Sequence, residues 1–92
     1  MNYIIYDHQI LGQTDDGTVL AKVTFPFAGD NTVDLNHTEV DESLRGQGIA
    51  GQLLERAAAK IRQEGWKTRC SCSYAQKWFA KHPDDQDLLA KD

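Results

Sequence analysis

The hydrophobic pattern of the chain changes period near residue 41. Before that point apolar and polar residues alternate, most clearly from Val19 to Phe25, which is the period of a half-buried strand. Turns are expected at Asp16-Gly17, where Asp-Gly tolerates the positive φ of a tight hairpin, and at residues 28–31. The first part of the chain therefore predicts strands over residues 3–6, 9–13, 19–25 and 33–40.

The part after residue 41 has the period of a helix. Its apolar residues fall on one helical face, formed by Ile49, Leu53, Leu54, Ala57, Ala58 and Ile61. Residues 41–43 are expected to cap this helix, and Gly65 is expected to end it. A strand over 66–71, a short helix over 75–80 and a further helix start at Pro83 follow. This order predicts an α/β or α+β domain whose sheet is covered by a long helix.

Composition and charge narrow the function classes. With 92 residues the chain has room for one domain, which we expect over residues 1–92 as a monomer. The net charge of −4 argues against a nucleic-acid partner, since neutralising phosphates needs a clustered basic surface. No segment approaches the roughly 20 apolar residues of a membrane span, so we expect no membrane partner and a cytoplasmic location. Cys and His residues lack the spacing of metal ligands, so no metal is expected.

Residues 45–51, Arg-Gly-Gln-Gly-Ile-Ala-Gly, are the most informative stretch. Three glycines at a helix start cost stability unless the bare backbone has a use. The dinucleotide fingerprint fits poorly, because Ser71 stands where an acidic residue is needed. A P-loop fits poorly too, because Gln52 stands where the lysine belongs. A glycine-rich helix start packed tightly on the sheet stays open as a purely structural alternative.

Within this stretch, Arg45-x-x-Gly48-x-Ala50 resembles the R/Q-x-x-G-x-G/A signature of the GCN5-related N-acetyltransferases (GNAT). Residues 37–40, 72–74 and 82–83 extend the likeness, so that residues 31–89 resemble the compact, single-domain GNAT-like proteins of the Yjdj type. The resemblance implies a minimal GNAT-like fold with a mostly antiparallel N-terminal sheet. It also implies a long central helix after a Gly-rich pyrophosphate loop, a splayed strand and C-terminal helices.

The resemblance further implies binding of acetyl-CoA and transfer of its acetyl group to an unidentified amine. The backbone of residues 45–50 would hold the CoA pyrophosphate, and the strand at residues 38–40 would pair with the pantetheine arm. The implied cofactor-binding residues are Thr38, Glu39, Val40, Arg45, Gly46, Gln47, Gly48, Ile49, Ala50 and Cys72. The short length favours an open groove, and therefore a protein or peptide acceptor.

Four residues are candidates for the chemistry. Cys72 either accepts the acetyl group or lines the site, and a helix start after it would lower its thiol pKa; an ordinary buried cysteine is the structural alternative. The resemblance places Phe79 where longer GNAT enzymes carry a proton-donating Tyr, which leaves Tyr74 or Cys72 as the acid. His37 and Glu39 are candidate bases for the amine, and a hydrogen-bonded His37 on a sheet face is the alternative.

Two other functions stay open. The protein is alternatively a non-catalytic acetyl-CoA sensor or carrier, or a small protein-interaction domain in which the Gly-rich turn is structural. Binding without turnover would favour the first, and absence of any thermal shift with acetyl-CoA would favour the second.

Overall fold

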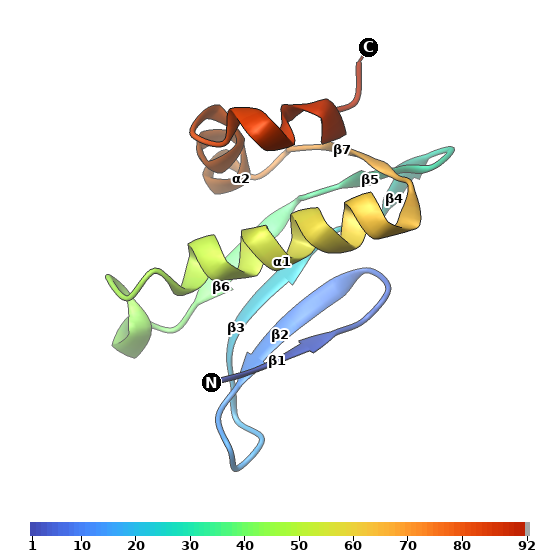
Figure 1. The fold of residues 1–92 in the computed structure, drawn as a ribbon. Helices are drawn as coiled ribbons and strands as arrows, with labels where there is room; N and C mark the ends of the chain where they lie inside the picture. The colour runs from blue at the N-terminus through green and yellow to red at the C-terminus, as the bar shows by residue number, and fades with distance from the viewer. Residues whose placement is uncertain (92) are drawn as a thin grey trace.

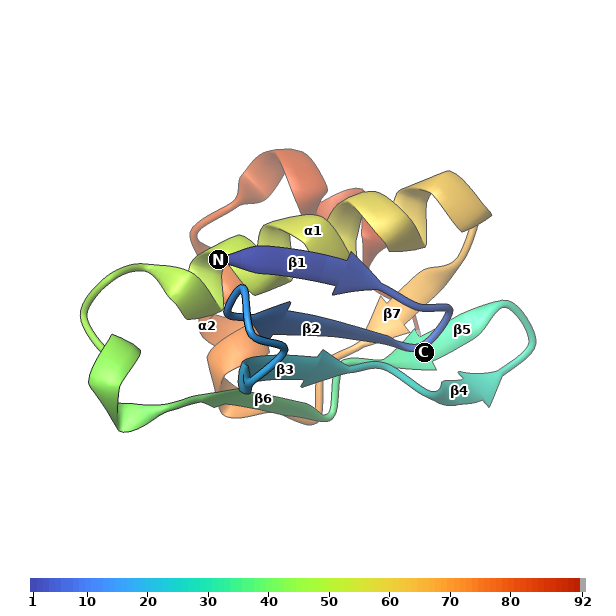
Figure 2. The same ribbon diagram turned by 90° about the horizontal axis from the view of Figure 1, so that it is seen from below.

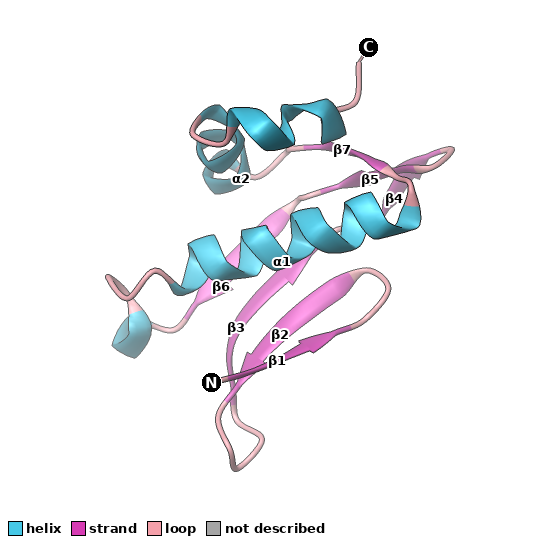
Figure 3. Cartoon of the chain, viewed as in Figure 1, coloured by secondary structure: helices cyan, strands magenta, loops and turns pink. Residues whose placement is uncertain are grey.

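The computed structural model describes residues 1–91 as two small sheets with helices around them (Figure 1, Figure 3). The first sheet is antiparallel and has the order β1 (Asn2–Ile5), β2 (Gln9–Gln13), β3 (Val19–Thr24), β6 (His37–Val40). The second has the order β4 (Phe27–Gly29), β5 (Thr32–Asp34), β7 (Lys67–Arg69), and β5 runs parallel to β7. The helices are the 3-10 helix η1 (Glu42–Leu44), α1 (Ile49–Glu64), α2 (Ser73–Ala80) and the 3-10 helix η2 (Pro83–Leu88). The predicted α/β (α+β) fold class is therefore confirmed.

Helix α1 covers one face of the first sheet, and in Figure 2 it lies behind β1, β2 and β3. The predicted apolar face is confirmed, because all of its members except the half-buried Ile49 are buried. They pack against the inward side chains of the alternating strands, among them Ile10 and Val23, both fully buried. Within residues 1–91 no helix combines the length and the apolarity that a bilayer crossing needs.

The strand predicted over residues 33–40 is divided between the two sheets. The N–H of Leu35 donates to Arg69 O in the second sheet at 2.9 Å, whereas the N–H of Asn36 donates to Thr24 O in the first at 3.3 Å. The prediction of one continuous strand is thus wrong, because alternation in a sequence does not show which sheet a strand pairs with. After Leu35 the chain turns away from β7, and β6 pairs only with β3 among the described strands.

The turn expected at residues 28–31 and the start of α1 also differ from expectation. Residues 28–31 were expected as a turn, but Phe27–Gly29 is a short strand and the turn is confined to residues 30–31. Asp41 caps η1 instead of α1, and Glu42 and Ser43 lie inside η1: the Asp41 carboxylate accepts from the Ser43 N–H at 3.0 Å. Helix α1 begins only at Ile49, after a loop. Its predicted end at Gly65 is confirmed.

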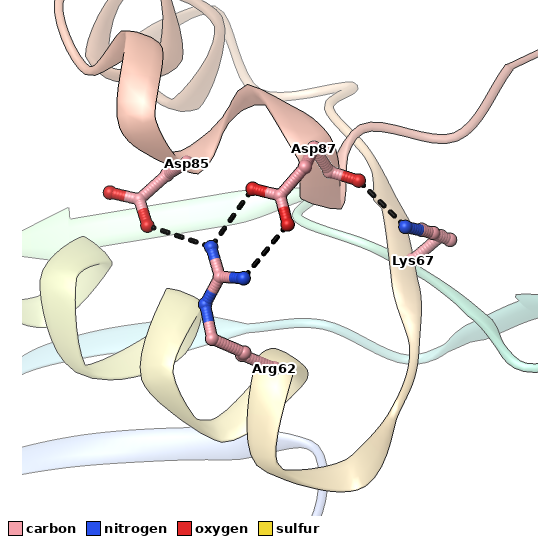
Figure 4. Close-up of polar contacts among 4 residues, drawn as sticks. All are labelled: Arg62, Lys67, Asp85 and Asp87. Atoms are coloured by element: carbon pink, nitrogen blue, oxygen red, sulfur yellow. Dashed lines mark hydrogen bonds and ion pairs between the residues drawn. The ribbon is translucent and has the colours of Figure 1, made fainter.

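The C-terminal helix is fastened to α1 by ion pairs (Figure 4). Arg62 donates to both carboxylate oxygens of Asp87, at 2.8 and 2.9 Å, and to Asp85 at 3.2 Å. Lys67 Nζ donates to the backbone oxygen of Asp87 at 2.7 Å. The hydrogen bond to Arg62 lowers the pKa of the Asp87 carboxyl below its ordinary value. These contacts hold η2 against the end of α1 and the start of β7.

Replacing Arg62 with Met is expected to loosen this attachment with little change in the rest of the fold. Arg62 is about half exposed, and water and salt weaken such pairs, so the global unfolding temperature should fall only slightly. Amide hydrogen exchange by mass spectrometry should speed up in residues 83–90. Lys60→Met is the matched control, because Lys60 pairs with Asp7 and Glu64 away from η2. Equal exchange rates of residues 83–90 in the two variants would contradict the role of Arg62 in holding η2.

Candidate functional site

An open groove of about 430 Å³ lies between β6, the start of α1 and the start of α2. It exists because the chain leaves the second sheet after Leu35 and forms β6 in the first sheet, where no described strand pairs with the other edge of β6. We call it the β6–α1 groove, and its lining residues are Thr38, Val40, Leu44, Arg45, Gly46, Gly48, Ile49, Ala50 and Tyr74. Most of the expected cofactor-binding residues thus lie together, whereas Glu39, Gln47 and Cys72 are not part of the lining.

Strand alternation separates the candidate residues of β6. Thr38 and Val40 are half-buried and line the groove, while His37 and Glu39 are exposed on the other face of the sheet. There His37 Nε2 lies 2.7 Å from Glu39 Oε1, and Lys22 Nζ lies 3.9 Å from the other oxygen of Glu39. The hydrogen bond with His37 lowers the pKa of the Glu39 carboxyl. The structure does not bring these two candidate bases into the groove.

The glycines of the loop are not required by packing. Gly46 and Gly48 have φ of 85° and 75°, a conformation that other residues adopt rarely. A Cβ built on either of them, or on Gly51, would meet no atom within 4 Å. The tightly packed helix start left open by the sequence is therefore not found. The bare backbone of Gly46 and Gly48 faces the groove instead.

The start of α1 offers backbone donors. The first bond of this helix runs from the Gln52 N–H to Gly48 O, at 3.1 Å. Within residues 1–91 the N–H groups of residues 48–51 have no acceptor, as expected for the first turn of a helix. No acidic side chain occupies that turn, and the exposed Arg45 lies beside it. The helix dipole, the free donors and Arg45 together favour an anion at this end of the groove.

Gly51 gives a test of how much of the loop is structural. It does not line the groove, its φ is not in the left-handed region, and its Cβ position is open. Gly51→Ala is therefore expected to raise the free energy of unfolding by about 0.5–1 kcal/mol, as measured by urea denaturation. Gly48→Ala is the matched contrast and should lower it, because alanine is strained at φ 75°. Destabilisation by Gly51→Ala would show a contact that the fold does not explain.

Cys72 lies next to the groove at the start of α2. It is half-buried, its Sγ donates to Thr38 Oγ1 at 3.7 Å, and its N–H donates to Leu35 O at 3.0 Å. Burial raises the pKa of this thiol, but hydrogen bonds from the Ala75 and Tyr74 backbone and from Thr38 outweigh burial, and the pKa is lowered overall. The expected effect of a helix start on this cysteine is thus present.

Cys70 differs from Cys72 in both surroundings and ionisation. It packs against the core and lines a separate apolar depression with Phe79 and Leu89. Burial, followed by the nearby Asp34 carboxylate, raises the pKa of the Cys70 thiol to about 11. The two cysteines are therefore chemically distinct although only Ser71 separates them.

Alkylation with iodoacetamide should distinguish the two thiols. At pH 7 only about one Cys70 thiol in ten thousand is ionised, so Cys72 should react at least ~10 times faster in the folded protein. The Cys72 rate should rise with pH and level off at a lower pH than in urea, because the folded protein lowers its pKa. Peptide mass spectrometry measures both rates. A faster reaction at Cys70 than at Cys72 would contradict this difference in thiol pKa.

The remaining candidate residues are placed as follows. Tyr74 lines the groove and is 44% exposed, whereas Phe79 is buried and faces the core. Gln47 is exposed and lines another depression, together with Tyr3. Leu44 lines the groove although it was not among the expected cofactor-binding residues. Its apolar character and its position directly before the Gly-rich loop are the features of the sequence that could have identified it.

A metal site would need a cluster of side chains that could ligate the ion. No group of three or more His, Cys, Asp or Glu side chains gathers in residues 1–91 as ligands for an ion would. The groove itself presents backbone N–H donors, the Arg45 guanidinium and the Tyr74 phenol, and the Cys72 thiol lies beside it.

Known proteins are similar to this chain in sequence or in fold. A family model described as GCN5-related N-acetyl-transferase matches residues 10–88. Protein NATD1 of Xenopus tropicalis is 38% identical over 68 residues, which make up 74% of this chain and 62% of that protein. The chain thus spans less than two thirds of the length of this relative.

Solved structures extend the likeness over nearly all of the chain. The solution structure of a GCN5-like protein from Staphylococcus aureus has a TM-score of 0.79 and 26% identity, covering 99% of this chain and 89% of that one. A GNAT family acetyltransferase from Elizabethkingia anophelis, solved with acetyl-CoA bound, has a TM-score of 0.64 and 19% identity. That match covers 82% of this chain and 51% of the other, and it shows a shared fold.

Proposed function

The chain belongs to the GCN5-related N-acetyltransferase family, and from that premise we propose that it binds acetyl-CoA in the β6–α1 groove and transfers the acetyl group to an amine. One observation carries the proposal: a single groove is lined by Leu44, Arg45, Gly46 and Gly48 of the Gly-rich loop, by the first turn of α1 with its free N–H groups, and by Thr38 and Val40 of β6. The acetyl-CoA bound to the Elizabethkingia anophelis relative supports the choice of ligand.

The residues of the groove fit this ligand. The pyrophosphate would accept from the N–H groups of Gly48, Ile49 and Ala50, and Arg45 would add a positive charge. The pantetheine arm carries amide groups, and the edge of β6 that faces away from β3 can pair with them as a further strand would. Val40 and Ile49 supply apolar contacts on either side. Glu39 and Gln47, whose side chains lie outside the lining, would take part through their backbones.

The transfer step needs an unprotonated amine and a proton for the departing thiolate. Bound acetyl-CoA supplies an activated thioester. We propose that Tyr74, the phenol in the groove lining, donates the proton, because the buried Phe79 has none to give. His37 and Glu39, the expected bases, lie on the other face of the sheet, so the amine would have to enter the groove already unprotonated. Cys72 is the alternative group, as an acid or as a temporary acetyl acceptor.

The proposal extends to the oligomeric state, the location and the acceptor of the protein. We propose one domain over residues 1–92 that acts as a monomer in the cytoplasm, with a protein or peptide amine as acceptor and with neither a nucleic-acid nor a membrane partner. Both cysteines are free, which fits a reducing compartment. The negative net charge favours a cationic acceptor.

Calorimetric titration with acetyl-CoA, followed by an acetylation screen on amines and lysine peptides, tests the proposal. Saturable binding and turnover that falls in Tyr74→Phe are expected. Binding without turnover on any amine, and without acetyl-Cys72 by mass spectrometry, would instead support a sensor or carrier. Absence of both binding and a thermal shift would support a protein-interaction domain.

A further inference from the structure

The β6–α1 groove has two chemically different ends. At one end lie the free N–H groups of α1 and Arg45, which favour phosphate. The lining then follows β6 backwards from Val40 to Thr38, roughly 7 Å further along the strand. At that second end the Thr38 hydroxyl accepts from Cys72 Sγ, and Tyr74 reaches the surface. A ligand with phosphate at one end and sulfur at the other would bring its sulfur to Cys72.

We propose that Cys72 is a site of reversible thiolation by CoA, formed when a CoA disulfide binds in the β6–α1 groove. This inference rests on the proposed function, because it uses the same ligand-binding groove. It goes beyond acetyl transfer, because the product is a covalent CoA adduct of the protein that occupies the groove and keeps acetyl-CoA out.

The reaction is a thiol–disulfide exchange that balances without any other oxidant. The Cys72 thiolate attacks one sulfur of the CoA disulfide, and the S–S bond of that disulfide breaks. A new S–S bond joins Cys72 to one CoA, while the second CoA leaves as a thiolate and takes up the proton that Cys72 released. A small thiol such as dithiothreitol reverses the exchange and restores both the cysteine and the empty groove.

Several contacts of Cys72 suit this exchange. The hydrogen bonds from the first turn of α2 and from Thr38 stabilise its thiolate, which is the attacking form. Tyr74 beside it is 44% exposed, so the leaving CoA faces solvent. Cys70 offers neither feature, because its thiol is held protonated and lies in the depression lined by Phe79 and Leu89.

The test compares two disulfides on the reduced, full-length chain. CoA disulfide and glutathione disulfide are added at equal concentration, and adducts are mapped by peptide mass spectrometry. We expect Cys72 to gain one CoA less two hydrogen atoms, at least ~10 times faster than it gains glutathione, because binding in the groove places the two sulfurs together. Dithiothreitol should remove the adduct, and the adduct should abolish acetyl-CoA binding in a calorimetric titration.

Matched variants identify the cause of the selectivity. Cys70→Ser should react as the unaltered chain does, and Cys72→Ser should form no adduct. Gly48→Asp, which places a carboxylate in the groove, should abolish the preference for CoA disulfide over glutathione disulfide, whereas the uncharged Gly48→Asn should keep most of it. Circular dichroism confirms that each variant is folded.

Three outcomes would overturn the inference: equal rates for the two disulfides, adducts on Cys70, or an unchanged CoA preference in Gly48→Asp. If acetyl-CoA still binds when the rates are equal, the thiolation fails and the proposed function stands. If acetyl-CoA does not bind either, both fail together.

Discussion

Gly48→Asp is expected to weaken acetyl-CoA binding by at least about 100-fold, because it sets a carboxylate against the phosphates at the start of α1. Two negative unit charges about 4 Å apart repel each other by roughly 4 kcal/mol near a protein surface. Gly48 is the N-cap of α1 and lines the groove, and its Cβ direction is open, so the new side chain has room without unfolding the helix. Calorimetric titration at constant ionic strength measures the loss.

Gly48→Asn is the matched control for this prediction. Asn and Asp have the same shape, both tolerate the left-handed conformation of Gly48, and both are favourable N-cap residues. The two variants therefore differ only in charge. We expect Gly48→Asn to keep most of the affinity. Equal losses would assign the effect to bulk and would remove the anion from this end of the groove.

Leu35→Ala is expected to destabilise the fold by about 2–5 kcal/mol, a large part of the roughly 5–14 kcal/mol that holds a chain of this size folded. Leu35 is fully buried, and it stands at the point where the chain passes from one sheet to the other. Removing its side chain leaves a cavity in the core at the point where the chain passes between the sheets. Urea denaturation followed by circular dichroism measures the change.

Leu11→Ala provides the comparison for Leu35→Ala. Leu11 lies in β2 on the half-exposed face of the first sheet, opposite the face that α1 covers, so its truncation leaves no closed cavity. A loss below ~1 kcal/mol is expected there. If Leu11→Ala were as costly as Leu35→Ala, burial at the sheet junction would not be what stabilises this region.

Local sequence was a good guide wherever a structure depends on near neighbours. The alternation of β3 from Ala21 onward, the apolar face of α1 and the glycine that ends α1 are as predicted, because each depends on a repeat or a backbone preference readable within a few residues; Val19, expected on the buried side, is exposed. The Gly-rich stretch was likewise found from its own composition. Its residues Gly46, Gly48 and Ala50 line the groove.

The same local reasoning could not assign pairing partners or faces. Residues 33–40 alternate as one strand would, yet Leu35 bonds to Arg69 and Asn36 bonds to Thr24. His37 and Glu39 were grouped with Thr38 as site residues, although successive residues of a strand point to opposite faces. Which of those faces meets the groove depends on where α1 packs, and that is not a local property.

What the sequence by itself determined is the order of the elements, the buried face of α1 and the loop whose bare backbone can receive an anion. Only the tertiary structure decided that the chain leaves β7 after Leu35, that Thr38 rather than His37 faces the opening, and that Cys72 and Cys70 differ in ionisation. The physical reason is the distance along the chain over which the interactions act. Helix and turn preferences act over a few residues, whereas a groove is made by hydrogen bonds that join Leu35 to Arg69 and Cys72, more than thirty positions away along the chain.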